Sequence, residues 1–140
     1  PVKAYYVRAS MNPARHVELL PFINNMAQRL AECDVILCRA GAITVSELCA
    51  AGVASLLVPL VVSTTAHQRD NAIYMAERGA ALHLPQAGLS AQSLADTLQG
   101  LQREQLLQMA TQARGLARLQ SAAAVADAIE QLVKKKRAST

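Results

Sequence analysis

The sequence predicts an α/β fold, in which a Rossmann-like parallel sheet is flanked by helices. The composition is 52% hydrophobic and 17% charged, which is typical of a folded globular chain. Aromatic residues make up only 3%, so the core is expected to be aliphatic. Short, continuously apolar runs alternate with helical segments, and such runs are typical of parallel strands buried on both faces. A length of 140 residues fits one domain.

The elements are expected to follow one another closely. Two strands, at residues 2–7 and 17–20 with a turn at 12–13, precede a helix that is capped by Asn24 or Asn25 and ends near residue 32. Strands and helices then alternate, at residues 35–38, 42–51, 55–58, 67–78 and 81–84. Three further helices are expected at residues 90–101, 104–116 and 122–135. Right-handed crossovers make this a doubly wound layer, whose ligands bind beyond the carboxyl ends of the strands.

The positive charge is concentrated at the carboxyl terminus. The net charge is +4, and Lys134, Lys135, Lys136 and Arg137 are consecutive, so the remaining chain is close to neutral. We expect residues 134–140 to form a solvated basic tail, with weak peripheral contact to an anionic membrane as the alternative. Nucleic acid is not an expected partner, because the chain has no aromatic stacking platform and no basic stripe.

Cysteine usage indicates a reducing compartment. Cys33, Cys38 and Cys49 form no C-x-x-C pair, so they are expected to be reduced and buried in a cytoplasmic protein, without a zinc site. The longest apolar stretch, residues 49–62, is too short and too interrupted to span a bilayer. A strand-like segment follows Pro1 directly, without a methionine, so we expect the chain to be part of a longer protein.

One segment, CRAGAITVSE at residues 38–47, is typical of an anion site. A buried strand ends, a tight turn of small residues follows, and a helix begins with unpaired amides at Ala42, Ile43 and Thr44. Gly41 permits close approach of a diphosphate to the backbone, and the Glu47 carboxylate suits a ribose diol. The alternative is an ordinary strand–turn–helix joint with a solvent-facing glutamate.

A second segment, HQRDNA at residues 67–72, follows the next strand and faces the same edge of the sheet. The Gln68 side chain offers both a donor and an acceptor, which suits sugar hydroxyls. Asn71 is placed to cap or hold a loop, and His67 is interpreted as a positioning residue. The alternative is a plain polar start of a helix.

A third segment contains Phe22, the single phenylalanine of the chain, followed by Ile23. Both are expected at the end of a strand on the ligand edge, where they could cover a flat base. An ordinary contact within the core remains the alternative for these two side chains.

Together the segments resemble the MurG family, the bacterial transferases that use UDP-N-acetylglucosamine (UDP-GlcNAc) to make lipid II. The resemblance is carried by PFINNMAQRLAECDVILCRAGAITVSELCAAGVASLLVPL and by HQRDNA, and it extends from about residue 17 to the carboxyl terminus. It implies the GT-B architecture, of which this chain would be an incomplete C-terminal domain over residues 1–140. That domain binds the nucleotide sugar.

The resemblance also implies a set of binding residues. UDP-GlcNAc would contact Ile23, Ala42, Ile43, Thr44, Val45, Ser46, Glu47 and Gln68. Ile23 would lie at the uracil, Glu47 at the ribose and Gln68 at the donor sugar. Supporting positions would be Phe22, Arg39, Gly41, His67 and Asn71. No catalytic residue, metal site or cofactor is expected in this chain.

The function implied by the resemblance is donor binding during transfer of GlcNAc to lipid I, which forms lipid II in peptidoglycan synthesis. The lipid-linked acceptor would be bound by an N-terminal domain outside this chain, at the inner face of the plasma membrane. One alternative is a separate, non-catalytic UDP-sugar-binding subunit that is active only with a partner chain. A GT-B-type epimerase is a weaker alternative, because its acid and base residues are not found here.

Overall fold

The computed structural model describes residues 18, 20–60 and 66–138. The strand predicted at residues 2–7 and the turn at 12–13 lie outside this part of the chain. The strand predicted at residues 17–20 is wrong at both of its described positions, because Glu18 and Leu20 lie in irregular structure. Pro21 follows them directly and has no backbone N–H to donate to a neighbouring strand.

The described strands form a parallel sheet, as predicted. Its order is β1 (Val35–Cys38), β2 (Ala54–Leu57), β3 (Ala81–His83). The register pairs Val35 with Ala54 and Ser55 with Ala81. All four residues of the central strand β2 are buried, which explains why its sequence is apolar without alternation. β2 begins and ends one residue earlier than expected, and β3 ends at His83, one residue earlier than expected.

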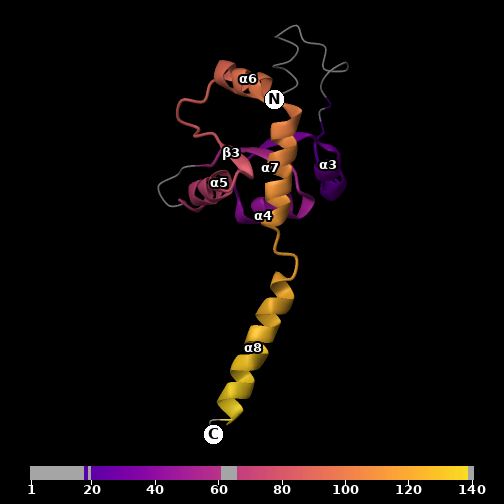
Figure 1. Cartoon of the computed structure of the whole chain (residues 1–140), viewed down its shortest axis with the longest axis vertical. Helices are drawn as coiled ribbons and strands as arrows, with labels where there is room; N and C mark the ends of the chain where they lie inside the picture. The colour runs from indigo at the N-terminus through magenta and orange to yellow at the C-terminus, as the bar shows by residue number, and fades with distance from the viewer. Residues whose placement is uncertain (1–17, 19, 61–65, 139–140) are drawn as a thin grey trace.

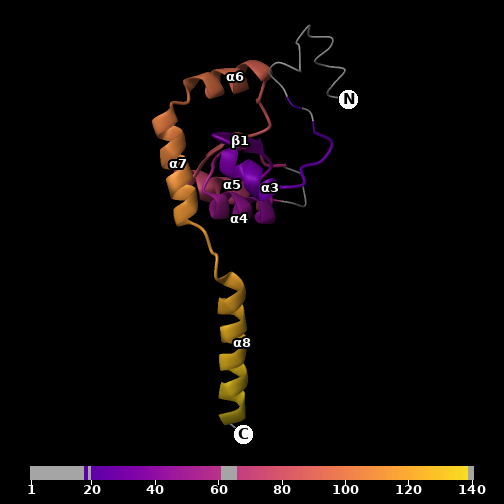
Figure 2. The ribbon, with the colours of Figure 1, turned by 90° about the vertical axis from the view of Figure 1, so that its right-hand side faces the viewer.

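Three helices lie together on one side of β1: α3 (Met26–Glu32), α4 (Ala42–Ala51) and α5 (His67–Glu77) (Figure 2). Asn25 caps α3, since its side chain accepts a hydrogen bond from the Gln28 amide at 3.2 Å. Gly52 ends α4 in the left-handed region, at φ 69°, a conformation that glycine favours. α4 contacts both α3 and α5, and α5 packs against β3.

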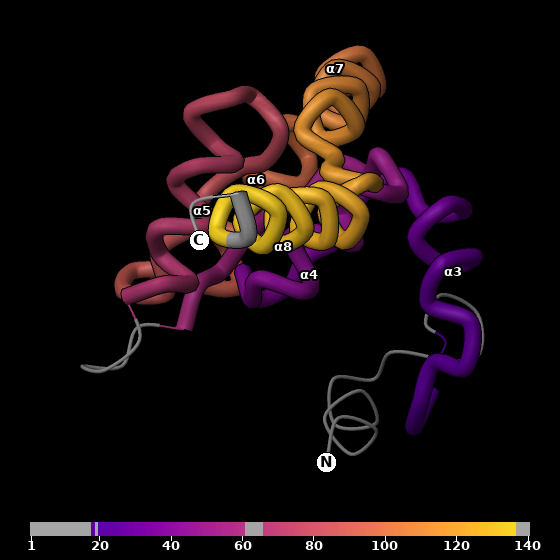
Figure 3. Tube along the Cα trace, turned by 90° about the horizontal axis from the view of Figure 1, so that it is seen from below, coloured from indigo at the N-terminus to yellow at the C-terminus, as the bar shows by residue number. Residues whose placement is uncertain are grey.

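The remaining helices are α6 (Ala91–Gly100), α7 (Arg103–Gly115) and α8 (Ser121–Ala138). Ser90 and Ser93 form a capping box at the start of α6. α7 packs against α4 and β2, and Arg114 donates a hydrogen bond to the Ala50 carbonyl at the end of α4. α8 extends away from the rest of the molecule (Figures 1 and 2), and Figure 3 views it nearly end-on from below. It continues three residues beyond its predicted end and carries the exposed Lys134, Lys135 and Lys136.

The core lies between the sheet and the helices that cover it. Leu48 of α4, Leu57 of β2 and Met75 of α5 are each 0% exposed. Cys49 is also buried, with its Sγ 3.6 Å from the Met75 sulfur, whereas Cys33 and Cys38 are half-buried. In the part of the chain that the structure describes, no helix combines the length and the apolar character that crossing a membrane requires.

Candidate functional site

The amino-terminal turn of α4 lies at the carboxyl end of β1. Gly41 is its N-cap, and no side chain in the described part of the chain caps it. The first helical hydrogen bond runs from the Val45 amide to the Gly41 carbonyl at 2.9 Å. The amides of Ala42, Ile43 and Thr44 precede that bond, so the positive end of the helix keeps its donors for another partner. This is the arrangement that the sequence predicts for an anion site.

Two side chains, Arg39 and Asn71, hold the turn that leads into α4 by hydrogen bonds. Arg39 donates from Nη1 to the Val58 carbonyl at 3.1 Å and to Gln86 Oε1 at 2.7 Å. Asn71 of α5 donates from Nδ2 to the Ala40 carbonyl at 3.0 Å. The turn after β1 is therefore joined to the ends of β2 and β3 and to α5, which gives the anion site a fixed shape.

Gln86 is a residue of this network that the sequence analysis missed. It lies in the loop after β3 and accepts the shorter of the two Arg39 bonds. A polar residue just after Pro85, at the carboxyl end of a parallel strand, is the signal that could have identified it.

The side chains of the first turns of α4 differ in what they offer a ligand. Thr44 lies close to the turn, since its Oγ1 would be 3.7 Å from a Cβ placed on Gly41. Ser46 Oγ donates to the Ala42 carbonyl at 2.9 Å, so its proton is used within the helix. Val45 packs against the core, and its amide is already bonded. Ligand contacts of Ser46, Val45 and Thr44 all remain predictions. The structure supports a contact of Thr44 better than a contact of Ser46 or Val45.

Glu47 borders a cavity of about 590 Å³ that runs along α4. The other walls include Tyr74 of α5 and Leu119 of the segment between α7 and α8. Glu47 is exposed, and no described residue bonds to its carboxylate. Its acceptor atoms are therefore available to a ligand.

Phe22 and Ile23 lie in the segment before α3. Phe22 is 74% exposed, so the alternative of a core contact is wrong for this residue. Both side chains line a cavity of about 420 Å³, and Ile23 also lines one of about 300 Å³. Met26 and Leu30 of α3 line both that smaller cavity and a further cavity bordered by Glu47. Met26 and Leu30 therefore lie between the cavity at Ile23 and the cavity at Glu47.

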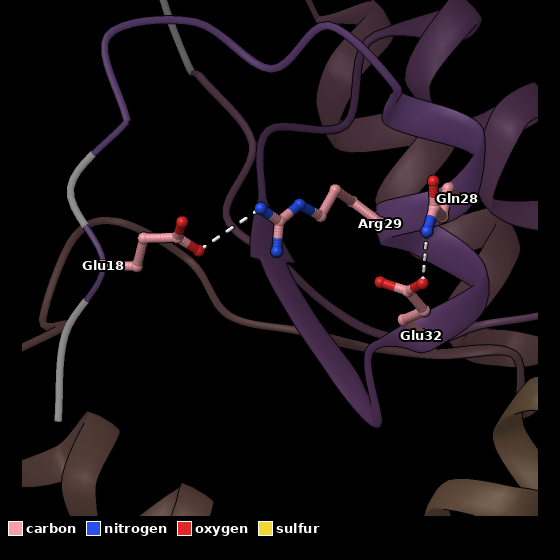
Figure 4. Close-up of polar contacts among 4 residues, drawn as sticks. All are labelled: Glu18, Gln28, Arg29 and Glu32. Carbon is pink, nitrogen blue, oxygen red and sulfur yellow. Dashed lines mark hydrogen bonds and ion pairs between the residues drawn. The ribbon is translucent and has the colours of Figure 1, made fainter.

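Gln28, Arg29 and Glu32 of α3 line the Phe22 cavity, and Figure 4 shows their polar contacts. Arg29 Nη2 reaches Glu18 Oε2 at 3.3 Å, and Gln28 Nε2 donates to Glu32 Oε1 at 2.6 Å. Both partners of the ion pair are about half exposed, so solvent screening leaves the pair a small contribution to stability. Its effect is to hold the segment at Glu18 close to α3.

The start of α5 faces the loop that follows β2. Gln68 Oε1 accepts a hydrogen bond from the Leu60 amide at 2.9 Å, which leaves its Nε2 group for a ligand. His67 is exposed and makes no hydrogen bond to another described residue. Residues 61–65, between β2 and α5, lie outside the described residues.

Burial favours the protonated form of the two thiols in these elements. Burial raises the pKa of Cys38 at the end of β1 and of Cys49 in α4. A raised thiol pKa keeps the sulfur protonated at neutral pH, and the thiolate is the nucleophilic form. The site therefore offers binding groups, namely backbone amides, a carboxylate and a side-chain amide.

Comparisons with known proteins agree with this fold. The profile of the glycosyltransferase family 28 C-terminal domain matches residues 3–132, which extends the resemblance to residues before 17. A protein of Methylibium petroleiphilum named UDP-N-acetylglucosamine--N-acetylmuramyl-(pentapeptide) pyrophosphoryl-undecaprenol N-acetylglucosamine transferase is 67% identical over 85% of this chain and 32% of its own length. The protein of the same name from Chromobacterium violaceum is 62% identical over 94% of this chain and 36% of its own length.

A solved structure has the same fold. The crystal structure of Acinetobacter baumannii MurG superimposes with a TM-score of 0.83 at 36% identity, covering 93% of this chain and 40% of that one. The chain spans about a third of the length of the curated relatives it matches, at 32% and 36%. Because the family profile matches nearly the whole chain, this chain belongs to the glycosyltransferase family 28 C-terminal domains.

Proposed function

We propose that this chain binds UDP-GlcNAc as the donor-binding part of a glycosyltransferase that adds GlcNAc to lipid I to form lipid II. The observation that carries the proposal is the uncapped start of α4, which leaves the Ala42–Thr44 amides without a partner in the described chain, with the exposed carboxylate of Glu47 three residues further along the helix. An anion and a diol on one ligand match these two groups, and a nucleoside diphosphate has both.

Each part of the donor has a proposed partner. The diphosphate binds the amides of Ala42, Ile43 and Thr44, and the ribose binds Glu47. The uracil lies against Ile23 with Phe22 beside it, and the free Nε2 group of Gln68 donates to the sugar. As the bond to the sugar breaks, negative charge develops on the leaving diphosphate, and the positive end of α4 stabilises it.

The acceptor lipid is proposed to be bound by a part of the enzyme outside this chain. The contact of the enzyme with the membrane is proposed to be peripheral and on the cytoplasmic face. The exposed Lys134, Lys135 and Lys136 of α8 would contribute attraction to anionic lipid. A separate, non-catalytic UDP-sugar-binding subunit has less support, because the names of the relatives describe transferases whose own chains include the matched region.

Calorimetry on the complete protein tests the proposal. We expect UDP and UDP-GlcNAc to bind and ADP and GDP to bind at least about tenfold more weakly. Gly41→Ala tests the diphosphate position, because Gly41 has φ −64° and its added Cβ would meet Thr44 Oγ1 at an ordinary 3.7 Å, so the fold tolerates it.

The ribose position is tested separately. Glu47→Gln is expected to weaken UDP binding, and Glu77→Gln at the far end of α5 is the matched control that leaves it unchanged. Equal affinity for UDP, ADP and GDP, or unchanged UDP affinity in both Gly41→Ala and Glu47→Gln, would overturn the proposal.

A further inference from the structure

We propose that Asn71 is a positioning residue for the diphosphate: by holding the Ala40 carbonyl, it turns the Gly41 N–H toward the anion site at the start of α4. This inference rests on the proposed function for its ligand. Its structural half, the orientation of one peptide group by one side chain, is independent of any ligand and can be measured without one.

The contact itself is specific and shielded. Asn71 Nδ2 donates to the Ala40 carbonyl at 3.0 Å, across 31 residues of sequence. Ala40 is 0% exposed, and its carbonyl accepts no other hydrogen bond within the described part of the chain. A buried carbonyl without a partner is costly, so Asn71 is needed to satisfy this one.

The orientation of the next amide follows from the geometry of the peptide bond. The Ala40 C=O and the Gly41 N–H belong to one planar group, and the described chain contains no cis peptide bond. In a trans peptide the C=O and N–H point in opposite directions. The Ala40 carbonyl points toward α5, so the Gly41 N–H points away from α5, and no described residue accepts its hydrogen bond. The Gly41 N–H is therefore a further donor without a described partner, in addition to the amides of Ala42, Ile43 and Thr44.

The same turn of α5 also holds the neighbouring loop. Gln68 lies three residues before Asn71, so both side chains project from one face of the helix. Gln68 Oε1 accepts from the Leu60 amide at 2.9 Å, just after β2, while Asn71 holds the turn after β1. One helical turn therefore fixes the loops at the carboxyl ends of two adjacent strands, which places the donor-sugar residue and the diphosphate turn at a set separation.

The test compares Asn71→Ala with wild type in the complete protein. Amide hydrogen exchange is followed for peptides that cover residues 39–45, without ligand. UDP and uridine affinities are then measured by calorimetry. We expect faster exchange of this turn, about tenfold weaker binding of UDP, and unchanged binding of uridine, which lacks the diphosphate. Gln92→Ala, which removes an exposed amide bonded at 2.7 Å to Asp96, is the matched control without either effect.

The outcomes separate the inference from the proposed function. Unchanged exchange at residues 39–45, or an equal loss of UDP and uridine affinity, overturns the role of Asn71. Failure of the wild-type protein to bind UDP overturns the proposed function, and the exchange measurement then still decides whether Asn71 holds the turn. If Asn71→Ala does not fold, Asn71→Ser keeps a small polar side chain with too short a reach and allows the same comparison.

Discussion

Arg39 at the end of β1 donates a hydrogen bond from Nη1 to Oε1 of Gln86, 47 residues later in the chain, at 2.7 Å. The same nitrogen donates to the Val58 carbonyl after β2 at 3.1 Å. One guanidinium therefore connects the carboxyl ends of all three strands. Because the proposed ligand lies at this edge, the pair contributes to the shape of the site as well as to stability.

A double-mutant cycle measures this coupling. Arg39→Lys and Gln86→Ala should each lower the free energy of unfolding by about 1 kcal/mol, since each loses the hydrogen bond that the charged Arg39 guanidinium donates to Gln86, which is partly open to solvent. The double variant should lose less than the sum of the two. Arg103→Lys is the control, because its pair with Asp34 is 83% and 71% exposed and contributes little. Additive losses in urea unfolding would show that Arg39 and Gln86 are not coupled.

Gly52 combines a positive φ with a close neighbour, so replacing it should cost more than replacing other glycines. Its φ is 69°, and a Cβ there would lie 3.1 Å from Arg114 Cβ of α7. We expect Gly52→Ala to lower the free energy of unfolding by about 2 kcal/mol, of which about half is left-handed strain. The measurement is the urea or thermal unfolding midpoint.

Two other glycines separate the causes. Gly79 also has a positive φ, 67°, but its added Cβ would meet Gln112 Cγ at an ordinary 3.8 Å. Gly79→Ala should therefore show the strain alone, about 1 kcal/mol. Gly100→Ala, with no heavy atom within 4 Å, should be neutral or slightly stabilising. If Gly52→Ala lowers the free energy of unfolding no more than Gly79→Ala does, the close contact with α7 does not contribute to the loss of stability.

The elements predicted most accurately are those whose ends carry local chemical signals. β1 and α4 have the predicted bounds, because Asp34 precedes the apolar strand, small residues follow it, and Gly52 ends the helix in a conformation that glycine favours. A cap at Asn24 or Asn25 was predicted for the same reason, and Asn25 provides it, since a cap bonds to its own helix.

What the sequence did not predict depends on distant parts of the chain. The Arg39–Gln86 bond joins residues that only the sheet brings together. The exposure of Phe22 is decided by what packs around it, so the residue type alone left a core position and a ligand contact equally open. The strand predicted at residues 17–20 failed at its described positions because Glu18 and Leu20 pair with no strand of the described sheet, which an apolar pattern alone does not reveal.

Ser55 carries a buried hydroxyl in the central strand. The residue is 0% exposed, and its Oγ has no hydrogen-bond partner among the residues that the structure describes. Removing an unsatisfied buried polar group relieves a desolvation cost, so Ser55→Ala should raise the free energy of unfolding by up to about 1 kcal/mol. Ser90→Ala is the contrasting variant, because that hydroxyl caps α6 and its loss should cost about 1 kcal/mol. Destabilisation by Ser55→Ala would mean that the hydroxyl has a partner in solution.

The buried thiols predict how stability depends on alkaline pH. Burial raises the pKa of Cys49 and of Cys38 above the ordinary value of 9.0. For Cys33, burial is again the main cause; a backbone hydrogen bond opposes it and the Asp34 carboxylate adds to it. The folded state thus holds these protons more tightly than the unfolded state, so the two states bind protons equally below pH 9.0 and differ above it. Stability should be independent of these groups below that pH and should fall as the pH rises through the raised folded-state values.

Urea unfolding at a series of pH values from 7 to 11 checks this expectation. Lysine and tyrosine also titrate in that range, so the informative quantity is the difference between wild type and Cys49→Ala. Removing the thiol should make the alkaline loss of stability smaller, even though the lost contact with Met75 lowers stability at every pH. Alkylation gives an independent readout, since iodoacetamide should modify Cys49 at pH 8 far more slowly in the folded protein than in urea. Equal alkylation rates in the two states, or parallel pH curves for the two proteins, would show that burial does not protect this thiol.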